Sequence, residues 1–540
     1  MTVAPAAAPA TPAEEGFYVD DVAFASGFII DQTPLLIATA AAMGGFRPPA
    51  VSGAFRYCDL GCGDGTTVCA LAALNPGAEF VGIDFNAGHV ATGTANAERL
   101  GLRNARFIQA SFTDLGGHGD LGEFDLISMN GIYAWLEEAP RQGAVAFVRR
   151  HLRSGGLFYV EYTALPGMAA VPPLWRLIQT LVPAAGRSSR QRAEDGLAML
   201  EILAKRGMGF LAANPRATQA ARHYLGQVKA DREAALDHFI HNAMASGFRP
   251  RFFDAMAAEM AEAGLQFAGR TALALNDIEL AVPPSQVPTF RELRDPIQRQ
   301  LLVDYIRNEQ NRRDVFIKDA QPDPEGAAAF LTQQLRLLGR SAPEALQPEI
   351  PVIGGHGVSL KGPIYDALRP AFEEAPAPAA SVALPAGNTP ELSLRAVQRL
   401  IASDQYFLCL PAPEAAIGLE PATAAGDTAG KPQLLAAVNR WLLDMAVSKL
   451  EGTQLGSPLT GGTAIALSPL EALLLDAAIE HGWEGCVEAL EQHLASEERK
   501  LPSARGPIAA NKIKRSDLEQ LLELLRGRKL TNMQRLGILS

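Results

Sequence analysis

The chain has 540 residues, more than three times the length of a typical domain, so we expect at least two domains. Apolar residues make up 48% and charged residues 20%, a balance that excludes a mostly disordered or collagen-like chain. The formal net charge of −11 repels phosphate, so we expect no nucleic-acid partner.

The five cysteines and the N-terminus exclude further classes of protein. The cysteines are too few for a disulfide framework and lack zinc-ligand spacing, and His238 and His241 have no third ligand in the sequence, so we expect no metal site. Residues 1–15 are rich in alanine and proline, which predicts a disordered tail and not a signal peptide. Without an apolar run long enough to cross a membrane, we expect a cytoplasmic protein.

Residues 56–163 alternate short apolar runs with helical segments, a pattern that predicts a parallel, doubly wound sheet with right-handed crossovers. The predicted strands are 56–60, 79–85, 105–111, 124–130 and 156–163. The predicted helices are 66–74, 86–100 and 137–152, the last ended by Ser154-Gly155-Gly156.

Beyond Pro166-Gly167 the pattern becomes purely helical, and we interpret residues 171–246 as a helical insertion. An amphipathic helix at 250–264 and strands at 265–275 and 312–319 then complete the same sheet. The Arg312-Arg313 pair is interpreted as a solvated face or a local ion pair.

From about residue 320, stretches rich in proline and alanine separate small modules. We therefore divide the chain into a domain at 16–320 that holds the insertion, a middle module at 321–425 and a helical C-terminal module at 426–540. Helices are predicted in these modules at 327–338, 394–403, 432–450, 469–480, 484–497 and 515–526.

The sharpest motif is the segment 59–66, Asp-Leu-Gly-Cys-Gly-Asp-Gly-Thr, which follows a strand and opens a helix. Its glycines let the backbone approach a ligand closely, and Asp84 ends the next strand, where a carboxylate accepts ribose hydroxyls. A dinucleotide loop would place its third glycine one residue after Gly65. The carboxylates of Asp59 and Asp64 suit a sulfonium and an ammonium better than a pyrophosphate.

This segment resembles the E/D-x-G-x-G-x-G motif of class I S-adenosylmethionine-dependent methyltransferases. The resemblance implies an α/β fold, with a Rossmann-like class I methyltransferase sheet, a helical insertion and mainly helical C-terminal modules. It also implies S-adenosyl-L-methionine as the cofactor. Ser111 and Phe112 stand where an acid and an apolar residue hold the adenine in that fold, and Ser111 replaces the acid. The implied cofactor-binding residues are Asp59, Gly61, Cys62, Gly63, Asp64, Gly65, Asp84, Phe85, Ser111, Phe112 and Met129.

Residues 124–133 admit a second interpretation, because F-D-L-I-S-M-N-G-I-Y has the spacing of the F-D-x-I-x-x-N-P-P-Y motif of nucleic-acid and glutamine N-methyltransferases. Gly131-Ile132 replace the two prolines of that motif. The acidic net charge also argues against a nucleic-acid substrate.

A further resemblance covers most of the chain. Residues 130–135 and 160–167 resemble the H-G-V-Y-S-W and V-S-Y-N-x-x-P-G segments of bacterial class I methyltransferases that carry a methyltransferase regulatory domain. Residues 308–316 and 455–461 resemble the F-R-R-D-V-F and A-S-P-x-x-G segments of that family. Its best-studied members methylate lysines of outer-membrane proteins. This chain departs from the family at the implied substrate mouth, at Asn130, Ala134, Thr163 and Met168.

The residues after strands four and five are the candidates for catalysis. A lysine must attack as the neutral amine, and Tyr133 and Trp135 are predicted to form an aromatic mouth that desolvates it. Packing of both rings beneath the insertion is the alternative. Glu161 and Tyr162 are expected to face the same crevice and to move a proton or orient the nucleophile, beside Asn130.

Protein lysine methylation is therefore the function that we predict. Two alternatives stay open: a methyltransferase for a small molecule or natural product, with the insertion as its lid, and a cofactor-binding scaffold without turnover. We also expect the apolar helices of the insertion to cap the active site and to pair two chains as a homodimer.

Overall fold

The computed structural model describes residues 27–117, 121–183, 186–230, 232–245, 247–341, 345–411, 431–502 and 508–540. The predicted tail at 1–15 lies outside these residues. Among the described residues, no helix combines the length and the apolar character that crossing a membrane requires.

A seven-stranded sheet organises the molecule, with the strand order β3-β2-β1-β4-β5-β7-β6. The first five strands run parallel, and β7 pairs antiparallel with both β5 and β6. The strands are β1 (Arg56–Leu60), β2 (Glu79–Asp84), β3 (Ala105–Gln109), β4 (Phe124–Met129), β5 (Leu152–Thr163), β6 (Leu265–Arg270) and β7 (Asn311–Lys318). This confirms the predicted sheet, and only two strand limits differ from the predicted ones by more than two residues. Strand β5 begins at Leu152, so Ser154-Gly155-Gly156 lie inside it, and β6 ends at Arg270.

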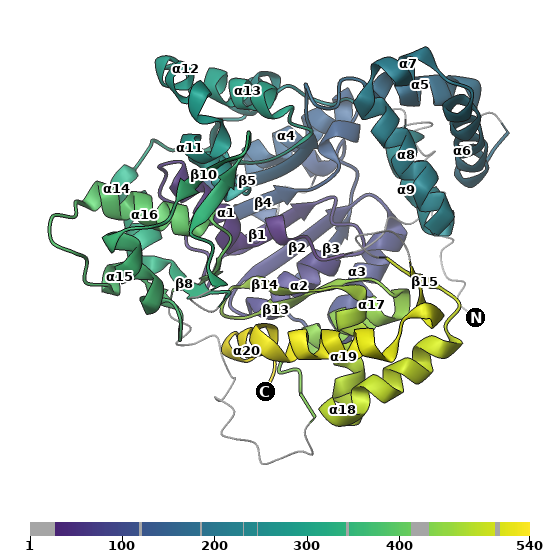
Figure 1. Cartoon of the computed structure of the whole chain (residues 1–540). Helices are drawn as coiled ribbons and strands as arrows, with labels where there is room; N and C mark the ends of the chain where they lie inside the picture. The colour runs from purple at the N-terminus through teal and green to yellow at the C-terminus, as the bar shows by residue number, and fades with distance from the viewer. Residues whose placement is uncertain are drawn as a thin grey trace, which may run out of the picture.

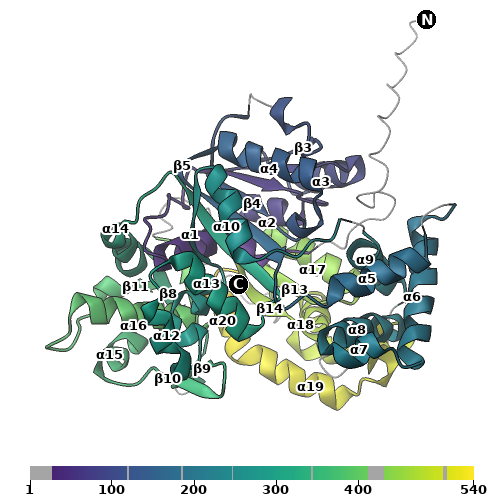
Figure 2. The ribbon, with the colours of Figure 1, turned by 90° about the horizontal axis from the view of Figure 1, so that it is seen from above.

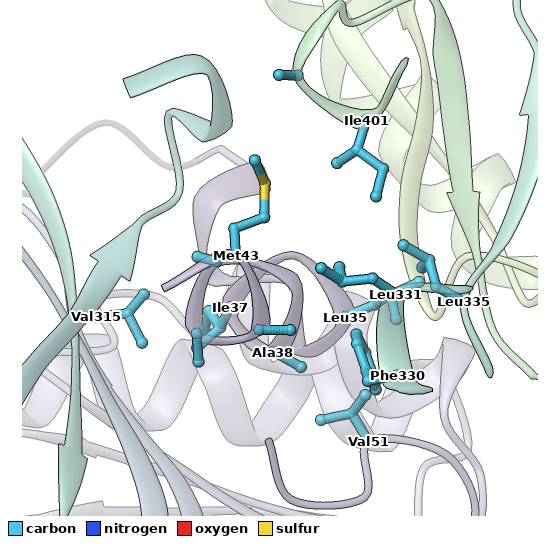
Figure 3. Packing of buried hydrophobic residues seen from close by; sticks show 14 of the residues in the cluster. Leu35, Ile37, Ala38, Met43, Val51, Val315, Phe330, Leu331, Leu335 and Ile401 are labelled. Atoms are coloured by element: carbon cyan, nitrogen blue, oxygen red, sulfur yellow. The ribbon is translucent and has the colours of Figure 1, made fainter. Parts of the chain in front are cut away.

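Helices cover both faces of the sheet (Figure 1). The predicted ones are α2 (Thr66–Leu74), α3 (Ala87–Arg99), α4 (Glu138–His151) and α10 (Phe253–Glu262). Helix α1 (Pro34–Met43), whose side chains are almost all buried, was not predicted from the sequence. Figure 3 shows α1 between Val315 of β7 and Phe330, Leu331 and Leu335 of the middle region. The helix touches β6 so closely that a Cβ on Gly44 would lie 1.7 Å from the Ala268 carbonyl oxygen.

The helical insertion follows β5 and forms a group of helices at one side of the sheet (Figures 1 and 2). It comprises α5 (Val171–Leu181), α6 (Ser189–Lys205), α7 (Gly209–Ala213), α8 (Pro215–Ala230) and α9 (Arg232–Ala243). Its own apolar core contains Trp175, which meets Tyr224 and Phe239 edge to face. The prediction of a helical insertion is confirmed.

The chain beyond α10 and β6 adds α11 (Ile278–Ala281), α12 (Val287–Glu292) and α13 (Pro296–Arg307) before β7. The middle region contains α14 (Pro324–Ala329), α15 (Pro363–Ala371), α16 (Pro390–Ala402) and the short strands β8 (Arg336–Gly339), β9 (Glu349–Val352), β10 (His356–Ser359), β11 (Ala377–Pro378) and β12 (Tyr406–Cys409). The predicted helix at 327–338 is confirmed up to Gln334, where α14 continues as a π-helix (Phe330–Gln334), and is wrong at its end, which lies in β8. Buried side chains of this region share one apolar cluster with α1 and the sheet, so the core continues across the boundary predicted near residue 320.

The C-terminal region is mainly helical, as predicted. It contains α17 (Ala437–Lys449), α18 (Pro469–Ser496), α19 (Arg515–Leu524), α20 (Leu530–Arg535) and the short strands β13 (Thr453–Ser457), β14 (Gly462–Leu467), β15 (Lys500–Leu501) and β16 (Ile508–Ala509). The two helices predicted between 469 and 497 form α18, which breaks at Gly482. Trp441 and Leu442 of α17 share an apolar cluster with Leu74 of α2, and this cluster holds the C-terminal region against α2.

Candidate active site

The loop between β1 and α2 is built on three glycines in the left-handed region, with φ of 77° at Gly61, 55° at Gly63 and 75° at Gly65. A Cβ on Gly65 would lie 2.5 Å from the ring of Phe107, so packing requires glycine there. The Cβ position of Gly63 faces open space instead. The loop therefore exposes its backbone at the carboxyl ends of the parallel strands, where such sheets bind ligands.

Asp84 ends β2 beside this loop and is 5% exposed. Its Oδ2 accepts a hydrogen bond from the Gly63 amide at 2.9 Å, and its Oδ1 accepts one from the Asn86 amide at 3.0 Å. His89 Nδ1 lies 3.2 Å from the same Oδ1, and this contact raises the pKa of His89. The carboxylate is thus held in place by three groups. Sequence reasoning missed His89, which no motif marks and which the first turn of α3 brings back over Asp84.

Asp59 lies deeper, at 3% exposure, on β1. Its Oδ1 accepts hydrogen bonds from Gln32 Nε2 and Ser128 Oγ, both at 2.6 Å. Burial raises the pKa of Asp59 to about 7, against the lowering effect of these two donors. Within the described residues, Gln32 Oε1 is a buried acceptor without a hydrogen-bond partner. Gln32 was also missed, because it belongs to η1 (Ile30–Gln32), which lies before the first strand of the sheet.

The remaining predicted cofactor residues lie around the same strand ends. Asp64 Oδ1 accepts hydrogen bonds from the amide and the hydroxyl of Thr66, the first residue of α2. Phe85 follows β2 and is 38% exposed, while Ser111 Oγ lies 2.9 Å from Thr113 Oγ1 just after β3. Phe112 is half-buried, whereas Cys62 and Met129 are buried.

Asn130 and Glu161 form the neighbouring part of the site, at the ends of β4 and β5. Asn130 Oδ1 accepts a hydrogen bond from the Tyr159 hydroxyl at 2.8 Å. The side chain of Glu161 is partly exposed, and burial still raises its pKa to about 7. The Gly131 amide and the charge of Arg313 act in the opposite direction. Glu161 therefore changes charge near neutral pH, as a group that accepts or releases a proton must.

Tyr162 does not share this crevice, contrary to the prediction. Its hydroxyl donates to Asp314 Oδ2 at 2.7 Å, and its side chain is fully buried. Consecutive residues of a strand point to opposite faces of the sheet, so Tyr162 faces the core when Glu161 faces the site. Asp314 in turn pairs with Arg312, which also binds Asp304 at 2.6 Å, and both carboxylates are fully buried.

The two residues of the predicted aromatic mouth, Tyr133 and Trp135, also lie in different environments. Tyr133 is 1% exposed, its ring lies 6.5 Å from that of Tyr162, and burial together with the Glu259 carboxylate raises its pKa. It is a core residue and not part of an exposed gate. Trp135 is half-buried, and its ring lies 5.0 Å from that of Phe248, at the end of the insertion. Its indole Nε1 has no hydrogen-bond partner in the described part of the chain.

With this geometry in view, comparisons with known proteins identify the two central parts of the chain. Residues 52–195 match the family of methyltransferase domains, and residues 235–318 match a family described as a predicted methyltransferase regulatory domain. The chain therefore combines a methyltransferase domain with a methyltransferase regulatory domain. This confirms the class that the motif resemblance implied.

Curated relatives cover parts of the chain. An uncharacterised protein of Synechocystis is 31% identical over 60% of this chain and 61% of its own length. An uncharacterised protein of Rickettsia prowazekii is 29% identical over 30% of this chain and 28% of its own length. Trans-aconitate 2-methyltransferase of Deinococcus radiodurans is 37% identical over 20% of this chain and 37% of its own length. The chain thus aligns with less than two thirds of each of these relatives.

A solved structure matches almost the whole chain. PKMT2 from Rickettsia typhi, in complex with AdoHcy, aligns with 96% of this chain and 99% of its own with a TM-score of 0.65 at 14% identity. At that identity the likeness establishes a shared fold, from the sheet through the C-terminal helices.

Proposed function

We propose that this protein is an S-adenosylmethionine-dependent methyltransferase that acts on lysine side chains of a protein. One observation carries the proposal. The left-handed glycine loop and Asp84 lie at the same edge of the sheet as Glu161, a partly exposed carboxylate that ionises near pH 7. The candidate cofactor-binding residues and a proton-accepting group therefore lie along one edge of the sheet, at the ends of β1 and β2 and of β5, with β4 between them.

The residues around the loop fit S-adenosylmethionine. Asp84 accepts the ribose hydroxyls, and the acceptor oxygens of Asp59 and Gln32 suit the α-ammonium group. Ser111 and Phe112 border the adenine, and the open space beside Gly63 leaves room for the cofactor to approach the backbone of the loop. When bound, the cofactor supplies a methyl group on a sulfonium, and a neutral amine takes it.

The acceptor side suits an amine. Lysine arrives as an ammonium, which the carboxylates of Glu161 and the nearby Asp31 attract, and it must lose a proton before it attacks. Glu161 takes that proton, Asn130 orients the nitrogen, and Trp135 packs on Phe248 at the end of the insertion. PKMT2, which shares the fold over 96% of this chain, was solved in complex with AdoHcy, which supports S-adenosylmethionine as the cofactor. The lysine substrate class rests on the family resemblance of residues 130–135 and 160–167.

A small-molecule acceptor is the second candidate. The relative from Deinococcus radiodurans is a trans-aconitate 2-methyltransferase, and the insertion packs on Trp135 as a lid over a small substrate would. A scaffold that binds the cofactor without turnover is the third candidate, and an experiment must distinguish it from the two enzymes.

The test is incubation of the full chain with methyl-labelled S-adenosylmethionine and a bacterial lysate, with Asp84→Ala as the inactive control. We expect label in the protein fraction that acid hydrolysis releases as methylated lysine. Label confined to the small-molecule fraction would favour the second candidate. Cofactor binding without any transferred label would favour the scaffold.

Two features bear on where and in what assembly the protein acts. All five cysteines are free and buried, which is expected in a reducing compartment and supports a cytoplasmic location. Leu181 and Ile202 on the insertion are 46% and 45% exposed, which supports pairing of two chains through these helices. Sedimentation velocity over a range of protein concentrations tests that pairing.

A further inference from the structure

Three charged side chains from separate parts of the chain meet beside Asn130. Arg313 Nη1 lies 3.3 Å from Asp31 Oδ2, and Thr271 Oγ1 donates to Asp31 Oδ1 at 2.5 Å. Arg313 also stands directly opposite Glu161 in the antiparallel β5–β7 pair. We call Asp31, Glu161 and Arg313 the charge cluster.

The charge cluster joins the two matched domains. Arg313 and Thr271 belong to the regulatory domain, Glu161 belongs to the methyltransferase domain, and Asp31 precedes both. Gln32, the neighbour of Asp31, binds Asp59 in the cofactor pocket. The regulatory domain therefore contacts the acceptor side directly and approaches the cofactor side through two adjacent residues of η1.

The groups that face Glu161 are few and act in known directions. Arg313 on β7 favours its ionised form, and so does the amide of Gly131 after β4. Asp31 on η1 opposes ionisation, and Tyr159 on the same strand is a neutral phenol whose own pKa burial raises. Asp31 and Arg313 therefore shift the pKa of Glu161 in opposite directions. Their ion pair also means that a change in one of them alters the effect of the other.

We infer that Arg313 and Asp31 are positioning residues that set the charge of Glu161, so that the regulatory domain controls the acceptor site through the charge cluster. The inference rests on the proposed function where it assigns proton transfer to Glu161. A ligand that binds the Arg313 guanidinium changes the fraction of Glu161 that is able to accept a proton.

The inference predicts opposite effects for two variants. In Arg313→Gln a favourable positive charge is lost, so Glu161 ionises at higher pH. In Asp31→Asn an unfavourable negative charge is lost and Arg313 is released, so Glu161 ionises at lower pH. Each shift is expected to exceed about one pH unit, because a unit charge within about 12 Å in an effective dielectric of about 20 contributes at least that much.

The experiment follows the carboxyl carbon of Glu161 by NMR in the full chain labelled with 13C-glutamate, and its signal is assigned by its absence in Glu161→Gln. Arg291→Gln is the matched control, since it removes an exposed arginine of the same domain that pairs with Glu279. We expect titration near pH 7 in the wild type and the control, an upward shift in Arg313→Gln and a downward shift in Asp31→Asn.

Shifts of the same sign in both variants, or shifts no larger than in the control, would overturn the inference. The pH dependence of label transfer to lysate protein supplies a separate readout, whose acid limb should move with the NMR titration and vanish in Glu161→Gln. Opposite NMR shifts without any transfer of label would refute the proposed function and leave the electrostatic coupling supported.

Discussion

Replacement of Asp84 by alanine is the sharpest test of the cofactor pocket. The variant removes the acceptor of three groups, the amides of Gly63 and Asn86 and the imidazole of His89, at 2.9, 3.0 and 3.2 Å. It also removes two charge-assisted hydrogen bonds to the ribose, for a loss on the order of 2–4 kcal/mol of cofactor affinity. That loss weakens binding by about 30- to 700-fold.

Isothermal titration with S-adenosylmethionine measures the affinity, and a thermal melt of each variant reports whether the fold is kept. Glu79→Ala is the matched control, because Glu79 begins the same strand, is exposed and, among the described residues, forms its one ion pair with Arg56 at 2.9 Å. An exposed pair of that kind contributes at most about 1 kcal/mol to stability and nothing to this site. Affinity of folded Asp84→Ala within threefold of the wild type, or an equal loss in Glu79→Ala, would refute the assignment.

Three further predictions address the other predicted residues. Tyr162→Phe should lower the free energy of unfolding by about 1–2 kcal/mol in urea titrations, since Asp314 loses a buried donor, while turnover of the folded enzyme stays unchanged. Trp135→Ala should lower turnover far more than the cofactor affinity measured by calorimetry, because the ring borders the insertion and not the glycine loop; equal losses would make it a core residue. Asp59 keeps its proton to about pH 7 in the folded chain but loses it near pH 4 when unfolded, so its contribution to stability falls as pH rises between these values. Asp59→Asn should therefore lose less stability than the wild type between pH 5 and pH 8, and an equal loss would contradict the raised pKa.

The sequence predicted the strands and helices of the sheet well where apolar runs end at glycine, proline or asparagine. Helix α1 escaped because it is apolar on all sides, so it has no amphipathic period to detect. The short strands from β8 to β16 escaped for a different reason. Each of them has only two to six residues, which carries too little pattern to predict a strand, and β8 also pairs with β11 and β12, which lie far along the chain.

The residues of the candidate site also fall into two groups, those that the sequence predicted and those that it did not. The glycine loop and Asp84 were predictable because a ligand imposes a local pattern on one strand, one turn and one helix. Three other site residues could not be predicted in this way: Gln32, His89 and Arg313. They lie on η1, α3 and β7, outside the glycine-loop motif, and only the folded chain brings them to the site. The sequence was sufficient to predict that Tyr162 and Glu161 do not face the same crevice, since adjacent residues of a strand point to opposite faces of the sheet.

Strand β7 shows how one short segment carries two functions. Arg312 is fully buried between Asp304 and Asp314, with its guanidinium 4.0 Å from the centre of the Phe253 ring. Of the two alternatives that the sequence left open for it, a solvated face and a local ion pair, the ion pair is confirmed. Arg313, the next residue, points the other way, toward Asp31, and stands opposite Glu161. A buried cation with paired carboxylates tolerates no change of strand register, because a slip of one residue would bury Arg313 and expose Arg312. The buried cluster thereby fixes the position from which Arg313 acts on the acceptor site.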